Sequence, residues 1–384
     1  MSSWGMETKV DLMQSRIAMH NGNKLKLGLF AANCSNGRAM TTASERWLAD
    51  WDSNEQLAVL ADDVGIDFML PIARWDGYRG ETDHQGTTLE AITWATGLLA
   101  HTKRMTVFAT VHAPLINPVL AAKAFVTADL IGRGRFALNI VIGWNDAEFR
   151  MFGVEKRREH EARYEYGQEW IDAILRMWGP EEEFDFIGKY LDLRGLRLKP
   201  KPYGGTRPLM MNAGHSPAGR SYALRNCDAF FTAVHYRDAA DAAPDVVRVK
   251  EEGRQFGREI GVYTVGQVVC RPTRAEAQDY FRYWTEEVAD WGAADYMLGL
   301  KGIKREADPE RYDAMRRSLI HGQSGFTMIG TPDDVAEDLA RISAVGFDGI
   351  GFSFVNYLRE LPYFAQEVLP RLHRRGLRES APGG

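Results

Sequence analysis

Short apolar runs alternate with longer amphipathic runs along almost the whole chain. Runs of four to eight apolar residues predict buried strands, whereas apolar positions three and four apart predict helices. A near-continuous apolar run, such as RFALNIVIG at residues 135–143, is typical of a parallel strand covered on both faces. The pattern predicts eight strands, at residues 25–31, 67–71, 105–111, 135–143, 208–213, 229–234, 262–270 and 349–354.

Helical patterns fill almost every gap between these strands. A hairpin that turns near Gly188 is expected within residues 184–202, and residues 292–324 are expected to form an irregular insertion. Helix starts are predicted by cap signals at Ser53, at Thr87 with Glu90 as a capping box, at Asn117 before Pro118, at Ser216 before Pro217 and at Thr331 before Pro332.

Strands that alternate with helices in this way imply an α/β fold with a parallel sheet and right-handed crossovers. Eight such units favour a closed (β/α)8 TIM barrel over an open doubly wound sheet. The doubly wound alternative would place a G-x-G-x-x-G sequence after an early strand, and none occurs there. We expect one barrel domain over residues 25–375 with insertions near 145–206 and 292–324, an N-terminal arm over 1–24 and a C-terminal tail over 376–384.

Composition excludes several classes of function. The formal net charge of -5 is mild for 384 residues, and without a dense Lys/Arg tract it argues against a nucleic-acid partner. No run of about eighteen apolar residues occurs, so no membrane span is expected. Cys34, Cys227 and Cys270 lie far apart without metal-ligand spacing, so we expect no metal site and a reducing, cytoplasmic environment.

The C-terminal ends of barrel strands carry the chemistry of this fold, which selects candidate residues directly. Asn139 is polar within an apolar strand, and it is either a ligand contact or a core asparagine with satisfied hydrogen bonds. Thr110 follows the same logic, although threonine is common in strands. Arg74 either binds an anion or forms a surface ion pair, and His235 is selected by its position after the sixth strand.

The segment NAGHSPAGR (212–220) follows the fifth strand and leads into a helix. Gly214 permits a tight turn, Ser216 can cap the helix, and the free backbone N–H groups at the helix start favour an anion. A phosphate site and an ordinary helix cap are both compatible with this segment.

Four segments resemble the luciferase-like flavin monooxygenases, in particular the pyrimidine, alkanesulfonate and dimethylsulfone monooxygenases. They are RGRFALNIVIGWNDAEFRMFG (133–153), EHEARYEYGQEWIDAILRMW (159–178), FDFIGKYLDLRGLRLKPKP (184–202) and NAGHSPAGRSYA (212–223). The resemblance implies a monooxygenase that uses reduced FMN (FMNH2) and O2 on a small organic substrate, possibilities including a sulfonate, a sulfone and an N-heterocycle. It also implies an NAD(P)H:flavin reductase as partner and a homodimer or homotetramer.

Carried over residue by residue, the resemblance implies cofactor contacts and a set of catalytic residues. Ile142 departs from the Thr or Ser of many relatives, and Arg74 and Ile72 stand where pyrimidine-type relatives have lysine and methionine, which argues against a pyrimidine substrate. A deazaflavin (F420)-dependent dehydrogenase and a non-catalytic flavin-binding protein remain alternatives. The expected cofactor-binding residues are Ala73, Arg74, Asn139, Glu148, Arg163, Tyr164, Gly214, His215 and Ser216, and the expected catalytic residues are Thr110, Asn139 and His235.

Overall fold

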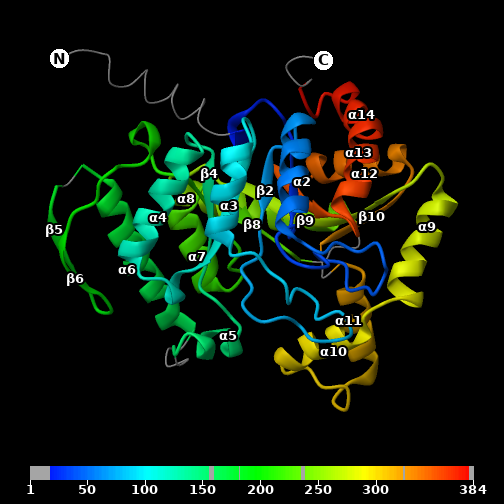
Figure 1. Ribbon diagram of the computed structural model, residues 1–384, viewed down its shortest axis with the longest axis horizontal. Coiled ribbons are helices and arrows are strands. Elements are labelled where there is room, and N and C mark those ends of the chain that lie inside the picture. The colour runs from blue at the N-terminus through cyan, green and yellow to red at the C-terminus, as the bar shows by residue number, and fades with distance from the viewer. Residues whose placement is uncertain (1–17, 155–159, 181, 235–237, 323–324, 380–384) are drawn as a thin grey trace.

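Eight parallel strands form a closed ring in the computed structural model, which describes residues 18–154, 160–180, 182–234, 238–322 and 325–379 (Figure 1). Each ring strand overlaps one of the predicted strands, so the TIM-barrel prediction is confirmed. In ring order they are β1 (Lys26–Phe30), β2 (Phe68–Leu70), β3 (Thr106–His112), β4 (Phe136–Val141), β7 (Leu209–Asn212), β8 (Ala229–Phe231), β9 (Gly261–Cys270) and β11 (Gly349–Ser353).

The stagger of the strands also matches a TIM barrel. Following paired residues once around the ring, from β9 through β11, β1 and the others back to β9, ends eight residues from the start. A shear of eight tilts the strands so that side chains from alternate strands share a layer inside the ring. The barrel interior is therefore packed with side chains rather than open.

Helices surround this ring, and most lie where the amphipathic pattern predicts them (Figure 1). The predicted hairpin is confirmed as β5 (Phe184–Ile187) and β6 (Asp192–Leu196). The helices in the gaps are α2 (Trp51–Asp63), α3 (Ala91–His101), α4 (Pro118–Ile131), α5 (Asp146–Met151), α6 (His160–Trp178), α7 (Pro217–Asn226), α8 (Ala239–Gln255), α9 (Arg274–Arg282), α12 (Pro332–Ala344), α13 (Tyr357–Glu367) and α14 (Leu369–Arg374).

The prediction of an irregular segment at residues 292–324 is wrong. Two helices, α10 (Trp291–Leu300) and α11 (Pro309–Ile320), pack against each other there around Met297, Leu298 and Leu319. A further strand, β10 (Phe326–Gly330), follows them and pairs with the second half of β9, on the side opposite β11. The pairing explains how a strand that the sequence pattern did not predict is held in place.

Two of the predicted helix caps are also wrong. Asp50, not Ser53, caps α2 and accepts a hydrogen bond from the Ser53 backbone N–H. Glu90, not Thr87, caps α3 by accepting from two backbone N–H groups. In both cases a carboxylate competes successfully with a hydroxyl, because a charged acceptor gains more from the positive end of a helix. The caps at Asn117, Ser216 and Thr331 are confirmed.

A buried carboxylate ties both ends of the described chain to the base of the barrel. Asp67, directly before β2, accepts hydrogen bonds from the backbone N–H of Leu27 and from the side chain of Asn23. It also forms an ion pair with Arg378, and both side chains are almost fully buried. The segment predicted as a tail is thus anchored at Arg378. No helix among the described residues is long and apolar enough to cross a membrane.

The barrel interior changes character from base to rim. Its lower layers are filled by rings and aliphatic groups, including Phe68, Phe108, Phe231, Tyr263 and Val265. Side chains two residues apart on a strand point to the same face, so the inward positions that follow Phe108 and Val265 carry polar side chains. On β3 and β9 they are Thr110 and Gln267.

Candidate functional site

The polar upper layer of the barrel brings Thr110 and Asn139 together. The two residues are paired in register on β3 and β4, and the Asn139 side-chain N–H donates to Thr110 Oγ1 over 3.1 Å. Thr110 in turn donates to the carbonyl of Pro71 over 2.6 Å. Asn139 Oδ1 is buried and has no hydrogen-bond partner among the described residues. The amide is thus held in place by its N–H, while its buried oxygen is left unpaired. This is the arrangement expected of a residue that contacts a ligand.

Arg74 and Glu148 form a second pair at the rim. Their side chains, 8% and 1% exposed, make an ion pair of 2.8 Å, and Glu148 also accepts from the backbone N–H of Trp75 over 3.0 Å. The Arg74 guanidinium lies 4.6 Å from the ring centre of Tyr78 and 5.8 Å from that of Trp144. This geometry decides against a surface ion pair for Arg74. Its Nε is buried without a partner among the described residues.

The loop that carries Ala73 is fixed by Asn33. The Asn33 side chain accepts from the Ile72 N–H over 2.9 Å and donates to the Ile72 carbonyl over 2.8 Å. This two-way contact holds the backbone beside half-buried Ala73. Buried backbone N–H and C=O groups need hydrogen-bond partners, and Asn33 supplies both for Ile72. Asn33 therefore fixes the position of Ala73 and Arg74, which follow Ile72.

The β7–α7 turn forms a third cluster with α6. Asn212 holds the turn by accepting from the Gly214 N–H over 2.7 Å, and Ser216 caps α7. The Tyr164 hydroxyl bonds to Ser216, and burial raises the tyrosine's pKa. A Cβ added at Gly214 or Gly219 would come within 2.8 or 2.5 Å of that hydroxyl, so both positions require glycine. Bare backbone at a helix start can approach an anion closely.

The remaining predicted site residues are Arg163, His215 and His235, and their positions differ. Arg163 Nη1 donates to the Gly143 carbonyl over 2.9 Å, and its buried Nε has no partner among the described residues. The His215 ring packs edge-to-face against Phe230, which faces away from the barrel interior, so the imidazole lies outside the interior as well. His235 lies outside the described residues.

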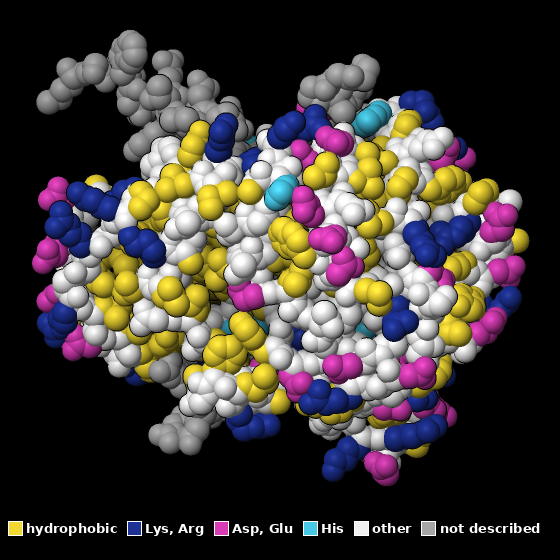
Figure 2. Space-filling view, in the orientation of Figure 1, with side chains coloured by type: hydrophobic (Ala, Val, Ile, Leu, Met, Phe, Trp, Pro, Cys, Tyr) yellow, Lys and Arg dark blue, Asp and Glu magenta, His cyan; other side chains and the backbone are white. Residues whose placement is uncertain are grey.

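Exposed aromatic side chains lie on the segments that follow β2 and β4 at this end of the barrel. Trp75 and Phe152 make an edge-to-face contact with ring centres 4.7 Å apart, and both are exposed, as is Trp144. Figure 2 shows hydrophobic side chains gathered where Figure 1 places α5. A cluster of exposed apolar groups beside buried charges is typical of a ligand-binding entrance.

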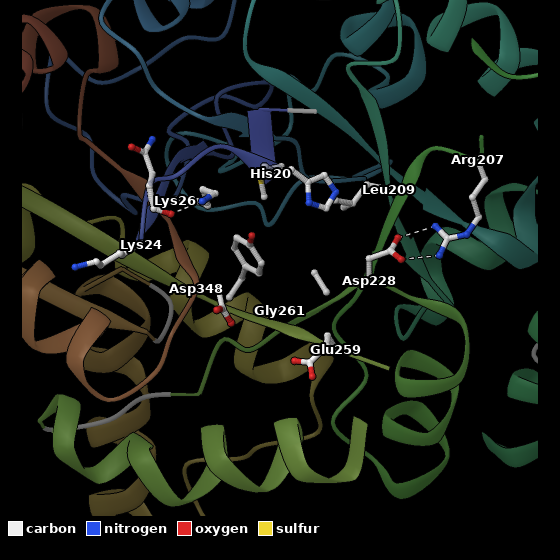
Figure 3. Close-up of a pocket in the computed structure, with 13 residues that line it drawn as sticks. His20, Lys24, Lys26, Arg207, Leu209, Asp228, Glu259, Gly261 and Asp348 are labelled. Atoms are coloured by element: carbon white, nitrogen blue, oxygen red, sulfur yellow. Dashed lines mark hydrogen bonds and ion pairs between the residues drawn. The ribbon is translucent and has the colours of Figure 1, made fainter. Parts of the chain in front are cut away.

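A cavity of about 500 Å³ lies at the opposite, N-terminal end of the strands (Figure 3). Its wall includes Lys26, Asp228, Glu259 and Asp348, and Asp228 is bonded to Arg207 through both carboxylate oxygens. Both positive and negative groups line it, so it offers no single charge to a ligand. Because barrel enzymes place their chemistry at the other end, we assign the site to the C-terminal rim.

His112, the last residue of β3, stands at a strand end where the barrel rule expects chemistry, although the sequence favours a structural or surface role for it. It is 8% exposed, and its Nδ1 has no partner within the described parts of the chain. Burial, with a smaller effect from the Arg74 charge, lowers its pKa to about 4. The imidazole is therefore neutral at the rim at physiological pH.

His112 leads to a prediction about pH. The unfolded chain binds a proton at this histidine below about pH 6.5, whereas the folded protein does so only near pH 4. The free energy of unfolding should therefore fall as the pH is lowered through this window, with His112 contributing about 2 kcal/mol between pH 7 and pH 5. Urea denaturation at both pH values measures the loss, and His112→Gln should reduce it. An identical loss in that variant would contradict the assignment.

Comparison with known proteins gives consistent matches. The sequence profile described as luciferase-like monooxygenase matches residues 25–349. The FMNH(2)-dependent dimethylsulfone monooxygenase of Pseudomonas fluorescens (strain Pf0-1) is 32% identical over 90% of this chain and 94% of its own. The pyrimidine monooxygenase RutA of Enterobacter sp. (strain 638) is 26% identical over 91% and 97%. A crystal structure of riboflavin lyase (RcaE) aligns with a TM-score of 0.83 at 21% identity, covering 94% of each chain.

Proposed function

Because this chain belongs to the luciferase-like monooxygenase family, we propose that it binds reduced FMN at the C-terminal rim and transfers one oxygen atom from O2 to a small organic substrate. The observation that carries the proposal is the Thr110–Asn139 pair with its unpaired, buried Oδ1. An amide held in this way can orient a bound ring or O2 without reorganising during the reaction.

The residues at the rim fit FMN. Ser216 and the bare backbone of Gly214 and Gly219 would hold the phosphate, with the Tyr164 hydroxyl beside them. Arg74, kept in place by Glu148, would lie along the ring system, and Arg163 Nε and Asn139 Oδ1 are buried groups that still lack partners among the described residues. Reduced FMN supplies the electrons that activate O2 when it is bound there.

The protein's own part is positioning and exclusion of water. Thr110, fixed by the Pro71 carbonyl, leaves the Asn139 amide in one orientation. Beneath them the interior is closed by Phe108, Phe231 and Val265, so water cannot reach the site through the barrel. A dry site strengthens each polar contact and protects reactive species from hydrolysis.

A substrate panel tests the proposal. With reduced FMN from a generic flavin reductase, we expect oxygen uptake and a product carrying one added oxygen for a sulfone, a sulfonate or an N-heterocycle. Mass spectrometry detects the product, and released sulfite reports on the sulfonate. Reduced deazaflavin in place of FMN is the control. Oxygen-independent turnover with deazaflavin, or tight FMN binding with no product from the panel, would contradict the assignment.

We also propose that a flavin reductase delivers the reduced cofactor and that the protein is a cytoplasmic homodimer or homotetramer. The three cysteines are all free and buried, as suits a reducing compartment. Helix α4 exposes four large apolar side chains, and Figure 2 shows hydrophobic groups on the side where α4 lies. Light scattering of the purified protein tests the oligomer. The α4 residues are Val119, Leu120, Leu130 and Ile131.

A further inference from the structure

Gln267 is a buried amide that the fold leaves unsatisfied. It is 1% exposed, and neither its Nε2 nor its Oε1 has a hydrogen-bond partner among the described residues. Most buried polar side chains are paired, and an amide can make up to four hydrogen bonds. By contrast, the equally buried Gln85 donates to the Gly37 carbonyl over 2.7 Å. Gln267 therefore calls for an explanation.

Its position places it at the mouth of the barrel. Val265 and Tyr263, two and four residues earlier on β9, point into the barrel interior, so the same face of the strand carries Gln267 inward. β9 lies four strands from β3 in the ring of eight, so the two are on opposite walls. Gln267 thus faces the wall that carries Thr110, with the mouth between them.

Two residues, Arg38 and Gly322, lie close to the chain at Gln267. Arg38, 2% exposed, donates to the Gly266 carbonyl over 3.2 Å and lies 5.6 Å from the ring centre of Phe30. Gly322 has a φ of 115°, and a Cβ there would come 2.9 Å from Gln267 Cβ. Gly322 therefore leaves room that a larger residue would occupy, and a buried cation contacts the backbone directly before Gln267.

The chemistry of a primary amide defines which ligand group would satisfy the hydrogen bonds of Gln267. Its N–H donor and its carbonyl acceptor lie on one edge, so the matching group presents a C=O next to an N–H. A sulfone or a sulfonate offers acceptors alone and would leave the buried Oε1 unpaired, which weakens binding. Lactams, ureides and cyclic imides present the complete edge, and so does the pyrimidine part of the isoalloxazine ring.

We propose that Gln267 is a recognition residue that pairs with such a C(=O)–NH edge in the site, supplied either by the flavin ring or by the substrate. The proposal deepens the proposed function and rests on it for the identity of the flavin. It predicts that ligands which keep the N–H bind more tightly than their N-methylated counterparts.

Two ligand pairs separate the sources. FMN and 3-methyl-FMN, followed by flavin fluorescence, test the ring edge; uracil and 1,3-dimethyluracil, followed by saturation-transfer NMR, test a substrate edge. In at least one pair the wild type should prefer the N–H form by about 10- to 100-fold, and Gln267→Leu should lose that preference. The pair that responds identifies the source.

Thermal melting of the variant guards against a purely structural effect. Gln267→Leu removes two unpaired polar atoms, so its melting temperature should equal or exceed that of the wild type. Gln85→Leu, the matched control, should melt lower and keep the wild-type preference. The proposal is overturned if neither pair shows a preference in the wild type, or if Gln267→Leu retains it. Absence of oxygen uptake with a preserved preference would instead count against the monooxygenase activity.

Discussion

Replacing Asn139 with alanine is expected to lower oxygenation by roughly 10²-fold or more while the barrel stays folded. The side chain makes a hydrogen bond to Thr110, but its Oδ1 has no partner among the described residues, so few structural contacts are lost. What is lost is a pre-oriented amide at the place where O2 and the flavin are proposed to meet. Oxygen uptake with reduced FMN measures the effect, and circular dichroism checks the fold.

Asn54→Ala supplies the matched control for this prediction. Asn54 is a fully buried asparagine on α2, outside the barrel, and accepts from Trp94 Nε1 over 2.8 Å. Its loss should lower stability and leave the turnover of the folded protein unchanged. Wild-type turnover in Asn139→Ala would remove that residue from the mechanism.

The second large effect is expected for Glu148→Ala. This change leaves the Arg74 guanidinium buried without its carboxylate, and breaking a buried pair in this way costs about 3–5 kcal/mol. The Trp75 N–H loses its acceptor as well. Urea denaturation should show the lost stability, and FMN titration should show at least a tenfold weaker affinity, because the loop beside the ring system is no longer fixed.

An exposed pair on the same loop provides the comparison. Arg79 and Asp76 form an ion pair of 2.7 Å, with side chains 52% and 26% exposed, so Asp76→Ala should cost about 0–1 kcal/mol. It should also leave FMN affinity unchanged. Equal effects from Asp76→Ala and Glu148→Ala would show that the Arg74–Glu148 pair has no special role at the site.

The eight barrel strands could be predicted because each is covered on both faces and is therefore apolar along its length. β10 could not, since its FTMIG sequence is held by pairing with β9 rather than by its own pattern. Helices α10 and α11 were not predicted because their apolar residues pack against one another and against Met40 and Tyr78. Those two residues are far away in the sequence, so the local pattern does not show the contacts. The caps at Asp50 and Glu90 show that side-chain charge decides between neighbouring candidates.

The candidate site was predictable to the extent that a polar residue stands out in an apolar strand. That signal marked Asn139, and the same signal is present at Gln267 within GVYTVGQVVC. Its meaning depends on which face of β9 points inward and on how many hydrogen bonds the amide makes, and neither can be read from one strand. The contact between Arg74 and Glu148 likewise could not be predicted from the sequence, because the two residues are 74 positions apart and only the fold brings them together.

The aromatic packing in the lower barrel has a consequence for the order of events in turnover. The axis of the barrel below the polar layer is filled by Phe68, Phe108 and Tyr263. The described residues therefore leave no opening from the site toward the N-terminal end of the strands. The cofactor, O2, the substrate and the product must then all enter and leave at the C-terminal end of the barrel. A ligand seated deeper must arrive before the one that covers it, so steady-state kinetics should be sequential with a fixed order, and excess substrate should slow the exchange of spent flavin.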